Sequence, residues 1–203
     1  MVLDFGLLRS GLFPESELSG EGMGSDPQQV VIKTGSFVSV KLGADSNTVD
    51  IDVPVGYTIY EMDIMCSLVA GTGVESVAFR VNNLSDSAYN SIFSKQTNAT
   101  WAATTLGGTY FNACRMLSEV GNVIISKTTI VLSTGLGLSS REITMFSHAS
   151  QRTGTDDFFE HISGTYTTAT VSAINTINLS CDAFAGSTSM FKAGSLFTVR
   201  GVA

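Results

Sequence analysis

The residues that most often carry chemistry are few in this sequence, and they are widely spaced. It has two histidines, His148 and His161, and three cysteines, Cys66, Cys114 and Cys181. Neither type forms the close pair that a zinc site needs, and an odd number of distant cysteines argues against a disulfide framework. The Gly-x-Ser-x-Gly turn of many serine hydrolases is missing. We therefore expect no enzyme, no catalytic residue, no metal centre and no cofactor, and we expect both histidines to be solvated or satisfied strand residues.

Carboxylates come together at two places. Asp156, Asp157 and Glu160 form an acidic cluster between Gly and Thr residues. In a loop they would offer the oxygen ligands that calcium prefers, and a solvated acidic loop is the simpler alternative. Glu61 and Asp63 lie on one face of an expected strand. A glycosidase needs two carboxylates about 5–10 Å apart in a cleft, whereas a pair along one strand face is usually solvated.

Trp101 is the only tryptophan. It lies in the expected loop from Asn98 to Gly108, where an indole ring offers a flat surface to a receptor or another partner. Packing of the ring in the core or in an interface is the alternative.

The composition excludes several classes of protein. The 203 residues include 18 acidic and 11 basic ones, which gives a formal net charge of −7, and the basic residues are scattered singly. A nucleic-acid partner is disfavoured, because phosphate binding needs clustered Lys and Arg. A hydrophobic content of 43% excludes a disordered chain. The length, 20 glycines, only 3 prolines and many Ser and Thr residues indicate one large β domain.

Neither a membrane span nor a leader is indicated. No predominantly apolar run reaches the ~18–20 residues that a transmembrane helix needs. At the start of the chain, Asp4 precedes the apolar cluster and Arg9 lies inside it. A signal peptide has a positive charge first and then an apolar run. We therefore expect no membrane partner and assembly in the cytoplasm.

The chain divides near residue 29. Residues 1–29 form an arm and a linker, with a Gly-rich stretch from Gly20 to Pro27. Two placements of the arm stay open: it folds back on its own domain, or it docks on a neighbouring subunit or larger assembly. In the second case its apolar residues are the assembly anchor: Leu3, Phe5, Leu7, Leu8, Leu12 and Phe13.

Residues 30–203 are predicted to form a single all-β domain. Alternating apolar and polar residues, bounded by Gly, Asn or Asp, predict eight or nine strands. Their expected ranges are 37–42, 49–55, 57–68, 75–81, 110–116, 123–132, 142–146, 166–179 and 196–199. The segment from Ser85 to Ser94 is assigned a helical turn. The fold expected is an antiparallel jelly-roll-like β-sandwich with an extended N-terminal arm.

Two segments together resemble a known family. They run from Val77 to Tyr89, with an Arg-x-Asn turn and a tyrosine, and from Thr170 to Ala203, with Phe-Lys-Ala-Gly-Ser before the last strand. They resemble small virion surface proteins of tailed bacteriophages. Arg200 stands where that family often has Tyr, which changes a surface contact. In these segments we expect Arg80 to bond the following turn with Asp86 answering its charge, and Phe191 and Phe197 to pack in the sandwich.

The resemblance implies a jelly-roll β-sandwich, usually a homotrimer, on the outside of a phage particle. Because the chain has no heptad run that would form a fibre shaft, we expect a capsid decoration or cement protein that binds the major capsid protein. The alternative is a tail-fibre, tail-hub or receptor-binding protein that binds tail proteins and mediates host attachment. In that case Trp101 and its neighbours contact the receptor.

Overall fold

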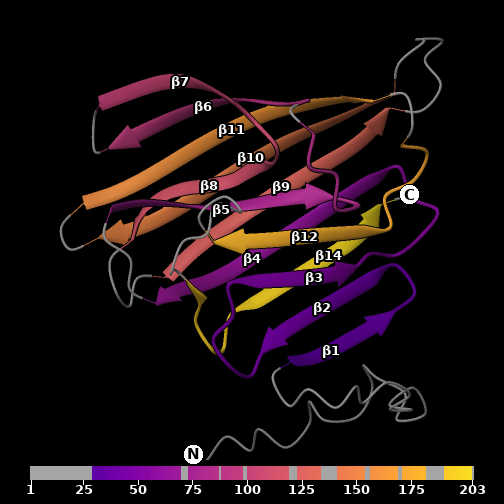
Figure 1. The fold of residues 1–203 in the computed structure, drawn as a ribbon. Helices are drawn as coiled ribbons and strands as arrows, with labels where there is room; N and C mark the ends of the chain where they lie inside the picture. Colours follow the sequence, from indigo (N-terminus) through magenta and orange to yellow (C-terminus); the bar gives the residue numbers. More distant parts are fainter. Residues whose placement is uncertain are drawn as a thin grey trace, which may run out of the picture.

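A computed structural model describes residues 29–69, 73–86, 88–97, 100–118, 123–133, 141–153, 156–168, 171–181 and 190–202. Over these residues the chain forms fourteen β-strands and no helix (Figure 1). The six apolar residues of the arm, Leu3 to Phe13, lie outside the described residues, and β1 begins at Gln29. The strands are β1 (Gln29–Thr34), β2 (Phe37–Leu42), β3 (Thr48–Asp52), β4 (Ile59–Val69), β5 (Gly73–Val81), β6 (Tyr89–Thr97), β7 (Thr100–Gly108), β8 (Phe111–Ser118), β9 (Val123–Ser133), β10 (Arg141–Thr153), β11 (Asp156–Thr168), β12 (Thr176–Cys181), β13 (Met190–Phe191) and β14 (Leu196–Val202).

The strands make two antiparallel sheets. The large sheet has the order β1-β2-β14-β4-β9-β10-β11-β6-β7, and the short β13 pairs with β4 beside this path. The small sheet has the order β3-β12-β5-β8. Figure 1 shows the small sheet in front of the large one, so that one face of the large sheet is covered and the other is open. The all-β prediction is confirmed.

The strand pairs are nested within one another. β5 pairs with β8, β4 with β9, β3 with β12, and β2 with β14. Each pair therefore encloses the previous one in the sequence. The hairpins β6–β7 and β10–β11 are insertions into this nest, and both extend the large sheet beyond β9.

The central strands of the large sheet present alternate residues to two different environments. The inner face is the one that packs on the small sheet, and the outer face is its opposite. In β4 the inner residues are buried, as the alternation predicts: Tyr60, Met62, Ile64, Cys66 and Leu68. Glu61 and Asp63 lie on the outer face. The core between the sheets is thus built by period-2 alternation.

The inner face also holds hydroxyl groups, and a β-bulge explains them. The pairing of β5 with β8 skips Ala113, whose carbonyl is turned away from the ladder. Ser147 Oγ donates to this carbonyl at 2.5 Å and Ser126 Oγ at 3.3 Å, while Thr128 Oγ1 lies 2.9 Å from Ser147 Oγ. The large sheet thereby satisfies a buried backbone acceptor of the small sheet, which would otherwise be costly.

Several boundaries predicted from the sequence are wrong. The segment from Ser85 to Ser94, assigned a helical turn, contains the start of β6, and the expected loop from Asn98 to Gly108 contains β7. The strand predicted over 166–179 is two strands, the end of β11 and β12, separated by residues 171–175. β1 was not predicted at all.

The two segments that carry the family resemblance lie side by side, because β5 pairs with β12. At the end of β5, Asn82 and Asn83 adopt φ of 52° and 58°. The Asn82 side chain donates to the carbonyl of Ala173 at 2.8 Å and accepts from the backbone N–H groups of Asn175 and Thr176. One asparagine therefore fixes the turn that leads into β12.

The other residues of these segments have structural roles as well. Phe191 and Phe197 are fully buried with ring centroids 5.0 Å apart, as predicted. Arg80 donates to the carbonyl and the hydroxyl of Thr109, and Asp86 accepts a hydrogen bond from Tyr166. Neither of these partners was predicted, because Thr109, in the turn between β7 and β8, and Tyr166 of β11 are distant in the sequence.

Candidate assembly surface

The outer face of the large sheet is the face that the small sheet does not cover (Figure 1). Large apolar side chains about half exposed lie on it, at positions between the core residues of the same strands: Met65, Ile92, Val123, Ile125, Phe146 and Phe159. Exposed apolar side chains scattered singly are ordinary, but several on one sheet face mark a surface suited to contacts with another molecule. The sequence signal for them is an unbroken apolar run, such as Val123-Ile124-Ile125, where both faces of the strand are apolar.

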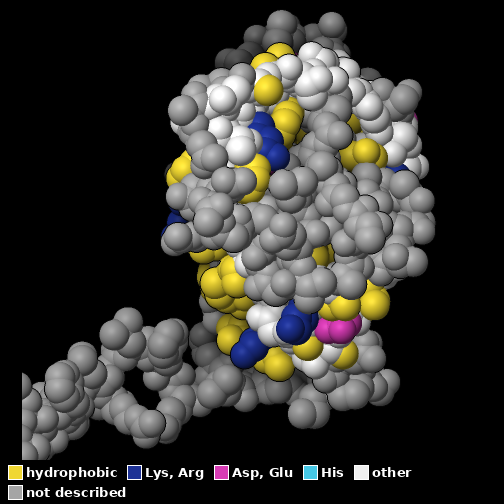
Figure 2. Space-filling model, turned by 90° about the vertical axis from the view of Figure 1, so that its left-hand side faces the viewer, with side chains coloured by type: hydrophobic (Ala, Val, Ile, Leu, Met, Phe, Trp, Pro, Cys, Tyr) yellow, Lys and Arg dark blue, Asp and Glu magenta, His cyan; other side chains and the backbone are white. Residues whose placement is uncertain are grey.

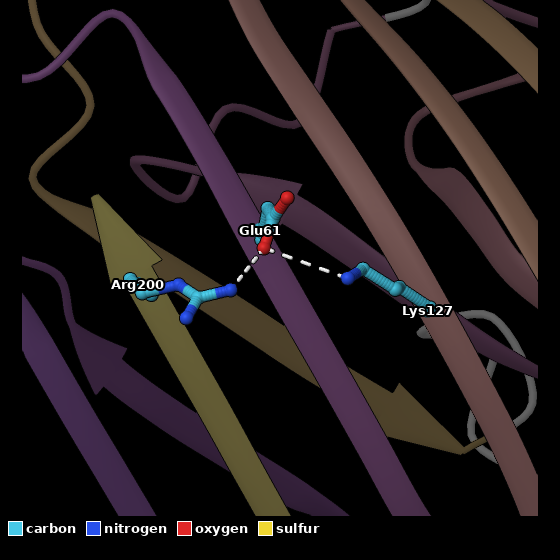
Figure 3. Close-up of polar contacts among 3 residues, drawn as sticks. All are labelled: Glu61, Lys127 and Arg200. Carbon is cyan, nitrogen blue, oxygen red and sulfur yellow. Dashed lines mark hydrogen bonds and ion pairs between the residues drawn. The ribbon is translucent and has the colours of Figure 1, made fainter. Parts of the chain in front are cut away.

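A charged cluster occupies the centre of this face. Glu61 of β4 accepts a hydrogen bond from Nη2 of Arg200 on β14, and Nζ of Lys127 on β9 lies 3.5 Å from the same carboxylate oxygen (Figure 3). The hydrogen bond from Arg200 is the main reason why the pKa of Glu61 is lowered, and Lys127 adds to it. Arg200 thus forms an ion pair with Glu61, which an uncharged side chain at this position would not form.

The two histidines meet on the outer face of the inserted hairpin. His148 of β10 and His161 of β11 are directly opposed in the strand register. Both are exposed, their Nδ1 atoms are 2.6 Å apart, and their rings are nearly perpendicular. The prediction of exposed strand histidines is confirmed, but their contact with each other could not be seen from a spacing of 13 residues.

Among the described residues, neither edge strand of the large sheet, β1 or β7, has a second strand partner. All six residues of β1 are exposed, and Val30, Val31 and Ile32 are more than half exposed. At the other edge, residues 102–105 of β7 are exposed. Figure 2 looks at the end of the sandwich where β6 ends and β7 begins, on the left in Figure 1. Hydrophobic side chains are exposed there beside Lys and Arg. Edge strands with apolar side chains are the usual sites of pairing with another chain.

The sequence-predicted contact residue Trp101 lies on β7 and pairs with Gln96 of β6. It therefore belongs to an edge strand and not to the loop that the sequence suggested. Its side chain lies outside the described part of the structure, as do the anchor residues of the arm.

The acidic cluster does not form a loop. Asp156 and Asp157 begin β11 and pair with Thr153 and Arg152, and the side chain of Glu160 is buried on the inner face. These residues therefore lie on a strand and not in the loop that both interpretations assumed. Within the described residues, no group of three or more His, Cys, Asp or Glu is placed to hold a metal ion.

The three cysteines are buried thiols and form no disulfide. Burial raises the pKa of Cys66 and of Cys114 well above the ordinary range. Because the thiolate is the reactive form, these residues are inert core side chains.

Comparison of the chain with protein-family models, with curated proteins and with solved structures finds no match. Among the described residues, no helix is long and apolar enough to cross a membrane.

Proposed function

We propose that this chain is a structural protein of a tailed-phage virion, specifically a capsid decoration or cement protein. It binds the outer surface of the capsid as a homotrimer, contacts the major capsid protein, and stabilises the shell. It is assembled in the host cytoplasm and ends on the virion surface. The proposal rests on the resemblance of the two segments described above and on three features of the fold.

The nested strand pairs are the first and strongest support. If β2, β3, β4, β5, β8, β9, β12 and β14 are taken in order, the first pairs with the last, the second with the seventh, and so on inward. A long hairpin rolled up in this way is the arrangement of a jelly roll, a fold of viral capsid domains and lectins. This observation carries the inference that the sandwich is a jelly roll with two inserted hairpins.

The position of β1 is the second support. Gln29, where the arm joins the domain, is the first residue of an exposed edge strand. An arm joined at this edge reaches a neighbouring subunit without breaking any strand pair of the sandwich. In a trimer, three such arms make weak contacts at once, and the rigid body converts them into firm attachment by avidity.

The state of Glu61 is the third support, because it argues against a glycosidase. The general acid of such an enzyme needs a carboxyl whose pKa is raised. Glu61, the best-placed carboxylate of the outer face, contacts two cations and has a lowered pKa. Its chemistry is that of a surface ion pair.

The test is binding of the purified full-length protein to capsids that lack it. Replacement of the six apolar arm residues by Ser is expected to abolish co-sedimentation with capsids, whereas the control change Val55→Ser, at an exposed apolar residue between β3 and β4, leaves it intact. Full occupancy by the arm variant would contradict the anchoring role, and no binding by the unmodified protein would contradict the function.

The tail or receptor-binding alternative is favoured by one observation, the uncovered edge strand β7 with its exposed residues 102–105. It predicts that the purified protein binds host cells and that Trp101→Ala abolishes this binding. Binding to cells without binding to capsids would replace the decoration proposal by this alternative.

A further inference from the structure

We infer that His148 and His161 form a two-histidine site for a divalent transition-metal ion, chiefly Cu²⁺, Zn²⁺ or Ni²⁺, on the outer face of the large sheet. The inference rests on the geometry of these two side chains and does not depend on the proposed function.

The two imidazoles are held together by a rigid frame. β10 and β11 pair along all 13 residues of each strand, and His148 and His161 are opposite each other near the middle of this ladder. β9 flanks β10 on one side and β6 flanks β11 on the other, so neither strand is at an edge. The backbone positions of the two ligands are therefore fixed before any metal arrives, which lowers the entropic cost of chelation.

The distance between the ring nitrogens fits a metal ion after a small movement. Zn–N bonds are about 2.0–2.1 Å long, so two imidazoles at an angle of about 90–110° on one ion have nitrogens about 2.8–3.4 Å apart. The Nδ1 atoms are 2.6 Å apart in this structure. Because both side chains are exposed, rotation about their own side-chain bonds opens this gap without disturbing the sheet.

The neighbouring charge is directed away from the site. Lys127 of β9 is opposite His148 in the register, and a cation there would repel a metal ion. Its ammonium group, however, lies 3.5 Å from Glu61 of β4, on the side of β9 away from β10 (Figure 3). On the other side, the residue opposite His161 is the uncharged Ser94.

The ligand type selects the metal. Imidazole suits Cu²⁺, Zn²⁺ and Ni²⁺, and the ordinary order of affinities places Cu²⁺ first. With two protein ligands, water fills the other positions, so the ion exchanges readily. The buried cysteines do not compete in the folded protein, because their thiols are inaccessible and, for Cys66 and Cys114, the pKa is raised.

The experiment is a calorimetric titration of untagged, full-length protein with ZnCl₂ in a non-coordinating buffer. We expect saturable binding of about one ion per chain. His148→Asn and His161→Asn should each weaken it at least about tenfold, since loss of even an outer-shell partner costs about that much. The matched control Lys127→Gln removes the neighbouring charge, keeps both imidazoles, and should bind with the same stoichiometry.

Thermal unfolding of the metal-free variants establishes that both Asn variants fold, which we expect because the changed side chains are exposed. The absence of saturable binding by the unmodified protein would overturn the inference. Binding that persists unchanged in either folded Asn variant would also overturn it.

Discussion

The two faces of the large sheet are built from the same strands and similar residue types, yet they differ in what their side chains do. On β9, Ile124 and Ile130 are buried, whereas Ile125, the neighbour of Ile124, is 55% exposed. Burial of an isoleucine side chain stabilises a protein by about 1.5–3 kcal/mol, and an exposed one gives little of this. The inner face therefore holds the fold together, and the outer face remains available for contacts with other molecules.

The polar residues follow the same division. Inner hydroxyls such as Ser147 satisfy the bulged carbonyl of Ala113, so they belong to the structural side. The polar residues of the outer face pair with one another: Glu61 with Arg200 and Lys127, and His148 with His161. Substitutions on the two faces should separate stability from surface chemistry.

The largest contrast is expected between two phenylalanines. Phe111 belongs to β8 of the small sheet and is fully buried against the inner face of the large sheet, where its ring packs against Tyr89 of β6 with centroids 4.7 Å apart. Its ring also packs against Phe79 of the small sheet, at 5.3 Å. Phe111→Ala should lower the free energy of unfolding by about 3–5 kcal/mol. Phe146 is 49% exposed on the outer face, so Phe146→Ala should lower the free energy of unfolding by less than about 1 kcal/mol. Denaturant unfolding measures both, and equal losses would break the comparison of the faces.

The next effect tests the turn between β5 and β12. Asn82→Ala removes three hydrogen bonds between the side chain and the backbone. It also places alanine at a positive φ, which alanine adopts less readily than asparagine. We expect a loss of about 2 kcal/mol in the free energy of unfolding. Asn83→Gly, at the adjacent exposed position with similar φ, should change it by less than about 0.5 kcal/mol. Chemical denaturation measures the free energy of unfolding of both variants. An unchanged value for Asn82→Ala would contradict the role of Asn82 in fixing the turn.

A smaller effect is expected at two glycines. A Cβ at Gly164 would lie 2.9 Å from the carbonyl oxygen of Asn90 and 2.9 Å from the Phe111 ring, so the close approach of the sheets requires glycine there. Gly164→Ala should lower the free energy of unfolding by about 1–2 kcal/mol. This is a net value, because alanine also reduces the conformational entropy of the unfolded chain, which is stabilising. At Gly107 the nearest atom would be 3.7 Å away. Gly107→Ala should leave the melting temperature unchanged or raise it, and a fall equal to that of Gly164→Ala would contradict this packing.

The smallest effect concerns the ion pairs of the outer face. The pKa of Glu61 is lowered in the folded protein, so its pairing stabilises the fold above the ordinary value of 4.5 and is lost as the pH falls through the lowered pKa. Arg200→Gln should therefore lower the melting temperature slightly at pH 7. The difference from the unmodified protein should shrink below pH 4.5 and in high salt. A difference that is constant across pH would show that the charge of Glu61 is not involved.

The sequence predicts the central strands of the large sheet well, because buried apolar residues alternate strictly with more exposed residues along β4 and β9. It fails for the inserted hairpins, where the alternation is mixed. In β6 the buried side includes Ser91 and the exposed side includes Ile92, and in β11 Glu160 is buried while Phe159 is exposed. Tertiary packing determines which side chains are buried at these positions, and the local sequence pattern does not predict it.

The candidate surface is predictable in part. The outward orientation of Glu61 follows from alternation, but its partner Arg200 is 139 residues away and becomes a neighbour only through the pairing of β14 with β4. The same holds for the two histidines, whose contact depends on the register of β10 with β11. Residue type can be read from the sequence, whereas register has to be seen.

Electron microscopy of phage particles made with and without this protein decides whether it decorates the capsid. We expect additional density distributed over the capsid of the complete particles, and heads that are lost on heating or at low salt when the protein is missing. Density at the tail alone, with intact heads and failed adsorption, would contradict the decoration role, and particles without any density for the protein would contradict a virion function altogether.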